Sequence, residues 1–285
     1  MDSANYSVQW DTPVSSLLRE DFVLTDDWAT EHITIIDALS HQTGYPRHDL
    51  SRGGETGAEL ARTLRHLPMT AEPRTTFLYN NIMFEVMGYL VEVITGRSLT
   101  SFFRNELWSP WGMHSTFHGL GDLDRSGRRD ELATSYWYNN DTDGYLAMPY
   151  MVFPDFDGAG SVISNVKDYS LYLRAMMDEA APISKSGYRA IKGPHMIEKA
   201  TQAPWTGPVL YGLAWFSSVF AGEQVWFHTG QVDQFEANMI MIPSRKFAVV
   251  MLQNSASLIR EVIPTRILYD YFDVPEERRV DIEER

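Results

Sequence analysis

Apolar residues recur at helical spacing through much of the chain before residue 205. The clearest case is residues 82–95, where apolar positions fall three or four residues apart and Gly96 follows as a typical helix stop. Such a stripe predicts a helix with one face packed against a core. The other stretches that predict helices are 33–41, 57–67, 98–107, 166–177 and 184–193.

The pattern changes after residue 205, where short runs rich in β-branched and aromatic residues alternate with Gly, Pro, Ser and Arg. Runs this close together predict antiparallel neighbours in one sheet. A helix is expected over residues 258–271, because its apolar stripe could cover that sheet. The predicted strands are 211–220, 224–227, 235–242 and 247–253.

These elements predict an α+β fold, in which an antiparallel sheet is flanked by helices and joined to a mostly helical subdomain. Residues 1–285 are interpreted as a single domain, mostly helical over about 30–205, with the sheet and last helix over about 206–275. Residues 119–154 are rich in Asp, Gly, Asn and aromatics and show no sustained period. We expect them to form a long surface loop of the kind that often borders an active site.

Composition narrows the possible functions. The 285 residues are 44% hydrophobic, which fits a packed globular protein, and their net charge of −14 disfavours nucleic acid or an anionic membrane as partner. There are no cysteines, so disulfides, cysteine nucleophiles and thiolate metal sites are excluded. No apolar run is long enough to span a membrane, and the first residues do not read as a signal peptide. A cytoplasmic location is therefore expected.

Two short motifs carry candidate chemistry. Tyr79-Asn80-Asn81 precedes the clearest helix, and His228-Thr229-Gly230 follows one of the predicted strands. Taken alone, Tyr79 could simply anchor a loop and His228 could simply end a strand. The alternative to these structural roles is a functional one, in which the phenol of Tyr79 and the imidazole of His228 belong to one site for acyl transfer.

The order of several segments supports that interpretation. The chain resembles the superfamily of serine β-lactamases and penicillin-binding-protein-like enzymes, which includes esterases and acyltransferases, and it looks most like fungal members. The matching segments, in the order of the family, are ITIIDALSHQTGYPRHD, FLYNNIMFEVMGYLVEVITG, LWSPWGM, GAGSVISNVKDYSLYLRAMM and FHTGQVDQF.

The resemblance implies roles for the first motif. In that family a serine attacks an acyl carbonyl, and a lysine one helical turn later and the tyrosine of Tyr-x-Asn handle its proton. Tyr79 would then be the general base, and Asn81 would position the substrate. A nearby cation would favour the ionised phenol, whose ordinary pKa is near 10.

The resemblance also implies roles for the second motif. His228 and Thr229 would line the substrate, beside Gly230, and the backbone N–H of Gln231 would be an oxyanion donor. Many β-lactamases have lysine where this chain has His228, and a histidine is mostly neutral at neutral pH. A small-molecule ester, amide or thioester is therefore a better match than an anionic substrate. No metal or organic cofactor is implied, and nothing in the sequence predicts the oligomeric state.

The nucleophile motif of the family, Ser-x-x-Lys, does not occur between Met1 and Tyr79. By resemblance it would lie about fifteen residues before Met1, together with a helix and two strands that complete the sheet. The chain as given is therefore expected to lack those elements. Either the protein begins upstream of Met1, or it is a relative that has lost the nucleophile. The tetrad Ser164-Asn165-Val166-Lys167 is interpreted instead as a helix start capped by Ser164.

The leading hypothesis is thus a β-lactamase-like serine hydrolase or acyltransferase, placed by resemblance in fungal secondary metabolism. The alternative is a catalytically inactive relative that binds a ligand or partner in the same cleft. Without a nucleophile only positioning and oxyanion stabilisation would remain.

Overall fold

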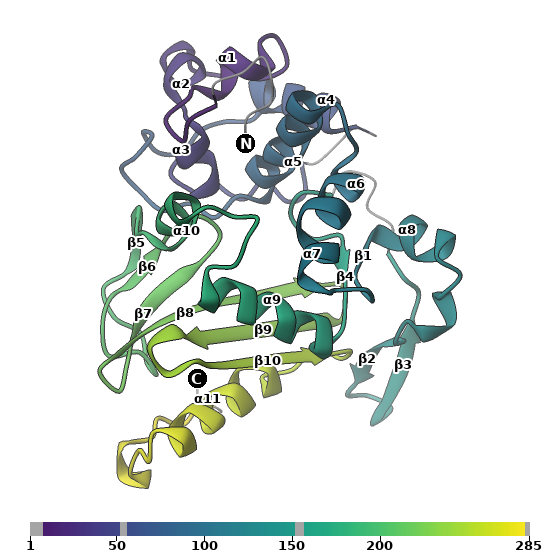
Figure 1. Cartoon of the computed structure of the whole chain (residues 1–285), viewed down its shortest axis with the longest axis vertical. Coiled ribbons are helices and arrows are strands. Elements are labelled where there is room, and N and C mark those ends of the chain that lie inside the picture. The colour runs from purple at the N-terminus through teal and green to yellow at the C-terminus, as the bar shows by residue number, and fades with distance from the viewer. Residues whose placement is uncertain (1–7, 52–55, 152–156, 283–285) are drawn as a thin grey trace.

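A helical region stands above an antiparallel sheet in the computed structural model, which describes residues 8–51, 56–151 and 157–282 (Figure 1). The helical region is built on the residues before the first strand, and the sheet comes from the last third of the chain. The helices of this region are α1 Val14–Leu18, α2 Asp27–His32, α3 Ile35–Leu39, α4 Gly57–Thr63, α5 Asn81–Thr95, α6 Leu99–Phe103 and α7 Ser109–Trp111, with a π-helical turn at Arg104–Trp108 before α7.

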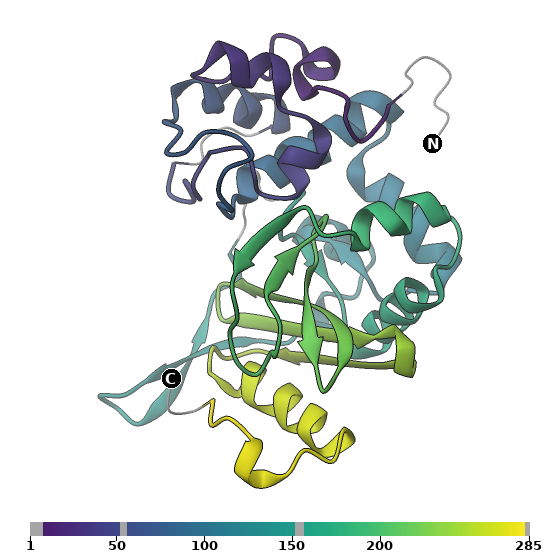
Figure 2. The same cartoon turned by 90° about the vertical axis from the view of Figure 1, so that its left-hand side faces the viewer.

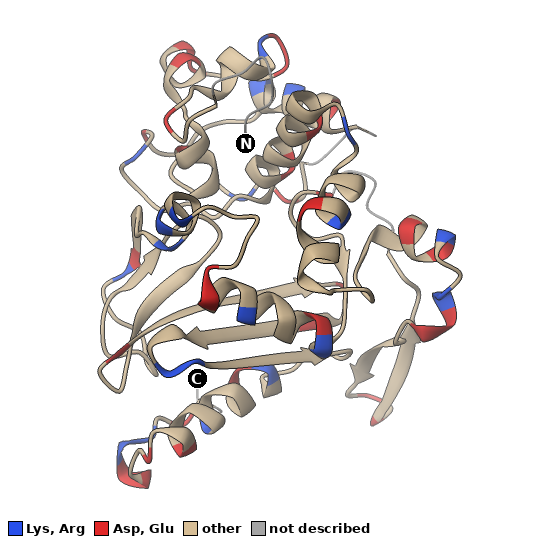
Figure 3. Cartoon of the chain, viewed as in Figure 1, with Lys and Arg blue, Asp and Glu red and all other residues tan. Residues whose placement is uncertain are grey.

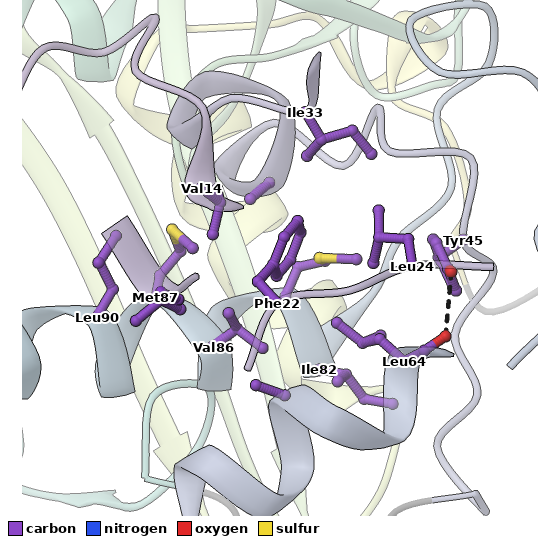
Figure 4. Packing of buried hydrophobic residues seen from close by; sticks show 14 of the residues in the cluster. Val14, Phe22, Leu24, Ile33, Tyr45, Leu64, Ile82, Val86, Met87 and Leu90 are labelled. Carbon is purple, nitrogen blue, oxygen red and sulfur yellow. Dashed lines mark hydrogen bonds between the residues drawn. The ribbon is translucent and has the colours of Figure 1, made fainter. Parts of the chain in front are cut away.

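Helix α5 lies in the core of the helical region, as its apolar stripe predicts (Figure 4). The buried Tyr45 reaches α4's end, where its hydroxyl donates to the Leu64 carbonyl at 3.1 Å. Helix α3 begins with a capping box, in which Thr34 and Asp37 satisfy each other's backbone N–H groups. Buried side chains that share this core include Val14, Phe22, Leu24, Ile33, Ile82, Val86, Met87 and Leu90.

The main sheet is antiparallel throughout, in the order β10-β9-β8-β7-β6-β5. Helices α9 and α10 pack on one face, where Met241 and Trp215 meet buried side chains of both helices, and α11 covers the other face (Figures 1 and 2). The elements are α9 Val166–Asp178, α10 Lys185–Lys192, β5 Met196–Lys199, β6 Val209–Tyr211, β7 Phe216–Phe220, β8 Glu223–Val232, β9 Phe235–Ile242, β10 Phe247–Gln253 and α11 Ile259–Tyr271.

The predicted α+β class is confirmed, with corrections in the sheet. The single run predicted over 211–220 is two strands, β6 and β7, because the chain turns between them with Ala214 at a φ of 66°. Strand β8 is longer than predicted and contains the whole of His228-Thr229-Gly230. Strand β5 was not predicted, because its four residues, Met-Ile-Glu-Lys, neither alternate apolar with polar positions nor form a long apolar run.

The prediction of a loop over 119–154 is wrong for most of its described residues. Helix α8 (Gly119–Arg125) opens this segment, and β2 (Ser135–Asn139) pairs with β3 (Gly144–Met148) in a hairpin that extends away from the body of the protein (Figures 1 and 2). The hairpin is held by its own ladder and by ring contacts such as Tyr138 with Tyr145 at 5.1 Å, so little of it is buried. Residues 152–154 lie outside the described residues.

The cap of α9 is one residue later than predicted. Asn165, not Ser164, caps the helix, since its side chain accepts from the N–H groups of Lys167 at 2.9 Å and Asp168 at 3.1 Å. The hydroxyl of Ser164 instead pairs with that of Thr116 at 2.8 Å, next to the short β1–β4 ladder of Phe117–His118 and Val162–Ile163. The tetrad is therefore a helix start, as interpreted, with a different capping residue.

Charged residues of both signs lie close together on the outer helices, for example on α8 and along α11 (Figure 3). Ion pairs follow from this mixing, such as Arg129 with Asp124 at 3.0 Å. Within the ranges that the structure describes, no helix is long and apolar enough to cross a lipid bilayer.

Candidate active site

Tyr79 ends the loop that leads into α5, and its two neighbours fix its position. Asn80 caps α5 by accepting the Met83 N–H at 3.0 Å, and its own amide donates to the Pro46 carbonyl at 2.5 Å. The backbone N–H of Asn80 donates to Nδ1 of the buried His41 at 3.0 Å. The backbone next to Tyr79 is therefore held in place by the backbone and side-chain hydrogen bonds of Asn80.

His228 faces Tyr79 from strand β8, with 6.3 Å between the ring centroids. Its Nδ1 lies 2.7 Å from the carbonyl of Thr229, so this nitrogen carries the proton and donates. Its Nε2 then accepts from the Tyr211 hydroxyl at 3.3 Å. The structure thus brings the phenol and the imidazole together, although 148 intervening residues separate them in the sequence.

A layer of aromatic rings surrounds this pair. The ring of His41 lies 4.2 Å from that of Tyr79 and 4.9 Å from that of Tyr211. Phe77 and Phe216 close the layer against Tyr211, at 5.1 and 4.6 Å. Such packing excludes water from one side of the Tyr79–His228 pair and so strengthens electrostatic interactions there.

Burial keeps both imidazoles neutral. It lowers the pKa of His41 to about 3, helped by the nearby His228 and by the charge of Arg47. It also lowers the pKa of His228, against the Thr229 carbonyl that favours the charged form. Burial raises the pKa of Tyr79, while Arg47 acts to lower it and Asp49 acts to raise it.

The other predicted residues extend from these two rings. Asn81 is the first residue of α5, and its amide donates to a carboxylate oxygen of Asp49 at 3.2 Å. Thr229, Gly230 and Gln231 continue along β8 from His228, and the last two are exposed to solvent. The substrate contact of Asn81 and the oxyanion role of the Gln231 N–H stay predictions.

The family model described as Beta-lactamase matches residues 4–270.

The chain belongs to the Beta-lactamase family.

Curated relatives agree with this placement. The chain is 39% identical over 291 residues to the "Unguisins hydrolase ungD'" of Aspergillus campestris, covering 98% of this chain and 54% of that protein. It is 34% identical to the "Unguisins hydrolase ungD" of Aspergillus violaceofuscus, covering 96% of this chain and 53% of that protein. The chain therefore spans about half the length of these relatives. The resemblance to this superfamily, and to its fungal members, is confirmed.

Solved structures show the same fold. A penicillin-binding protein homologue from Pyrococcus abyssi matches with a TM-score of 0.74 at 21% identity, covering 92% of this chain and 60% of that one. The D-amino acid amidase from Ochrobactrum anthropi matches with a TM-score of 0.73 at 18% identity, covering 95% of this chain and 78% of that one.

Three residues of the site were not singled out from the sequence of this Beta-lactamase family member. His41 and Arg47 lie within one of the segments that carry the resemblance, where neither was given a role, and Tyr211 was interpreted only as part of a strand. Their contacts with Tyr79 and His228 join distant parts of the chain, so no local pattern marks them. The available signal was the isolated histidine at the end of the helix predicted over 33–41.

The neutral state of His41 predicts a dependence of stability on pH. Its pKa in the folded protein is below the unfolded value near 6.5, so the unfolded state binds the proton first. The stabilisation is complete above about pH 6.5 and is lost as the pH falls towards 3. Between about pH 7 and pH 5 we expect a loss of about 2 kcal/mol in the free energy of unfolding from this group, measured by urea titration.

The variant His41→Gln should show a shallower pH dependence over that interval, because it removes the titrating ring. His114→Gln is the matched control, since His114 is exposed. An equally steep dependence in wild type and in His41→Gln would contradict the prediction.

Proposed function

We propose that this chain is the acyl-transfer part of a hydrolase that cleaves an amide bond in a small peptide-like metabolite. The observation that carries the proposal is the Tyr79–His228 pair, with ring centroids 6.3 Å apart and packed against a layer of aromatic side chains. A phenol there can serve as a general base, and a neutral imidazole can line the carbonyl of an uncharged substrate.

Several observations support an amide as the bond that is cleaved. The name unguisins hydrolase, which the two fungal relatives carry, supports hydrolysis, and the D-amino acid amidase among the structural neighbours supports an amide as the bond. His228 has no positive charge to hold a substrate carboxylate, because burial lowers its pKa.

Acyl transfer by this family uses a hydroxyl nucleophile, which would pass its proton to Tyr79. In the described parts of the chain, no serine or threonine hydroxyl hydrogen-bonds to the Tyr79 phenol or to the His228 imidazole. The informative measurement is therefore which serine, if any, an active-site probe labels covalently.

The test exposes the purified protein to a fluorophosphonate probe and to a panel of uncharged peptide amides and peptide esters. Labelling of one serine, mapped by mass spectrometry, together with hydrolysis of the amides would support the proposal. A folded protein that hydrolyses none of the panel and is not labelled would overturn it. If that inert protein binds the amides in calorimetry, it is a binding protein that keeps the cleft.

A further inference from the structure

Arg47 lies over the ring of Tyr79, with 4.9 Å between its guanidinium carbon and the ring centroid. Its Nε donates to a carboxylate oxygen of Asp49 at 2.7 Å, and the other oxygen of Asp49 accepts from Asn81 at 3.2 Å. Asp49 therefore ties the guanidinium to the first residue of α5, two positions after Tyr79. The whole array is built from the turn after α3 and the start of α5.

We propose that Arg47 is a positioning residue of this site, which acts through Tyr79 by holding its ring and stabilising the phenolate. The inference rests on the proposed function, because a phenolate is useful only to a general base. Its physical part, the coupling between guanidinium and phenol, is independent of any turnover.

The charges around the ring make Arg47 the group that matters. The titratable or charged groups that face Tyr79 are His41, His228, Tyr211, Arg47 and Asp49. The two imidazoles are neutral, and burial raises the pKa of Tyr211 well above 10, so that phenol is neutral as well.

Among these described neighbours, Arg47 is thus the cation and Asp49 the anion. Loss of a proton places a full negative charge on the ring system, to which a guanidinium over the face is attracted more strongly than to neutral phenol. Burial opposes that ionisation by raising the pKa of Tyr79. The charge of Arg47 acts to lower this pKa, whereas that of Asp49 acts to raise it. A fixed orientation matters here, and the bond to Asp49 supplies it.

A competing role is direct binding of a substrate carboxylate. The Arg47 side chain is 60% exposed, and within the described residues its two terminal nitrogens have no hydrogen-bond acceptor. In that role a substitution would weaken substrate binding and would leave the titration of Tyr79 unchanged. The two roles are therefore separable by measuring the phenol itself.

The experiment titrates Tyr79 by fluorine NMR in protein that carries fluorinated tyrosine, whose phenol ionises at lower pH. The Tyr79 signal is assigned by its absence in Tyr79→Phe. We expect Arg47→Gln to raise the midpoint of this signal by about half a pH unit, and Arg47→Lys, which keeps the charge, to raise it less. An unchanged midpoint in Arg47→Gln would overturn the proposal.

Arg245→Gln is the matched control. Arg245 also donates from Nε to a carboxylate at 2.7 Å, also lies over an aromatic ring, and is 52% exposed, but it belongs to the far end of the sheet. It should leave the Tyr79 midpoint unchanged. Should Arg47→Gln fail to fold, Arg47→Met takes its place as the neutral variant, and an unchanged Tyr79 midpoint in Arg47→Met would overturn the proposal.

Kinetics separate this inference from the proposed function. With an active protein, Arg47→Gln should lower kcat about threefold with KM little changed, as a half-unit shift in the Tyr79 midpoint implies, and should move the rising limb of the pH–rate profile to higher pH. A higher KM at constant kcat would show the carboxylate-binding role instead. If the protein hydrolyses no amide while the fluorine titration still shifts, the proposed function fails and the coupling between Arg47 and Tyr79 stands.

Discussion

Replacing Tyr79 by phenylalanine is expected to lower amide hydrolysis by about 10²–10⁴-fold, the usual contribution of a general base. The variant removes only the phenol oxygen. The ring contacts with His41 at 4.2 Å and with Arg47 at 4.9 Å remain possible. No side chain among the described residues hydrogen-bonds to the Tyr79 hydroxyl, so the fold should lose little stability. The measurement is kcat/KM on an uncharged peptide amide, beside the free energy of unfolding.

Tyr145→Phe is the control for this prediction, since Tyr145 is 64% exposed on the hairpin. It should retain the activity of the wild type. A Tyr79→Phe protein that folds and keeps its activity to within about threefold would show that another group accepts the proton. A loss of activity accompanied by unfolding would instead assign a structural role to the phenol.

Local patterns were sufficient where one face of an element packs into a core. Helix α5 and strands β9 and β10 were predicted almost to the residue. The apolar stripe of α5 is the face that the fold buries, and the two strands are apolar-rich runs bounded by turn residues. The family resemblance supplied what local patterns cannot, namely that Tyr79 and His228 belong to one site. The structure places their rings 6.3 Å apart.

The misses share a physical cause. The β2–β3 hairpin buries little surface, so its sequence shows no apolar stripe and was interpreted as a loop. His41, 39 residues from Asn80 in the sequence, accepts a backbone N–H that no pattern near either residue announces. Arg47 and Tyr211 likewise acquire their neighbours only when the helical region closes over the sheet.

The second large effect is expected at Asp37, a buried carboxylate that joins the segments carrying the site. Its oxygens accept from Thr34 at 2.8 and 2.9 Å, from Gln42 at 2.9 Å, and from two nitrogens of Arg74 at 2.8 and 3.0 Å. Asp37→Ala leaves these donors without their acceptor and opens the cap of α3. We expect a loss of about 3 kcal/mol in the free energy of unfolding, measured by urea titration.

The position of Asp37 makes a second consequence measurable. The backbone N–H of Arg74 donates to the Gln42 carbonyl at 2.7 Å, and that of Leu78 donates to the His41 carbonyl at 2.9 Å. These bonds align the loop segment that ends at Tyr79 with the segment after α3. Loss of the Asp37 clamp should loosen that alignment and lower kcat even where the protein is still folded.

Glu131→Ala is the contrasting control, because Glu131 pairs with Arg128 at the surface, where solvent screens the charges. It should change neither stability nor kcat appreciably. If Asp37→Ala were as harmless as Glu131→Ala, the bonds to Gln42 and Arg74 would not be what holds these two segments together. The packing of the apolar core alone would then hold the segment after Thr34 against the segment that ends at Tyr79.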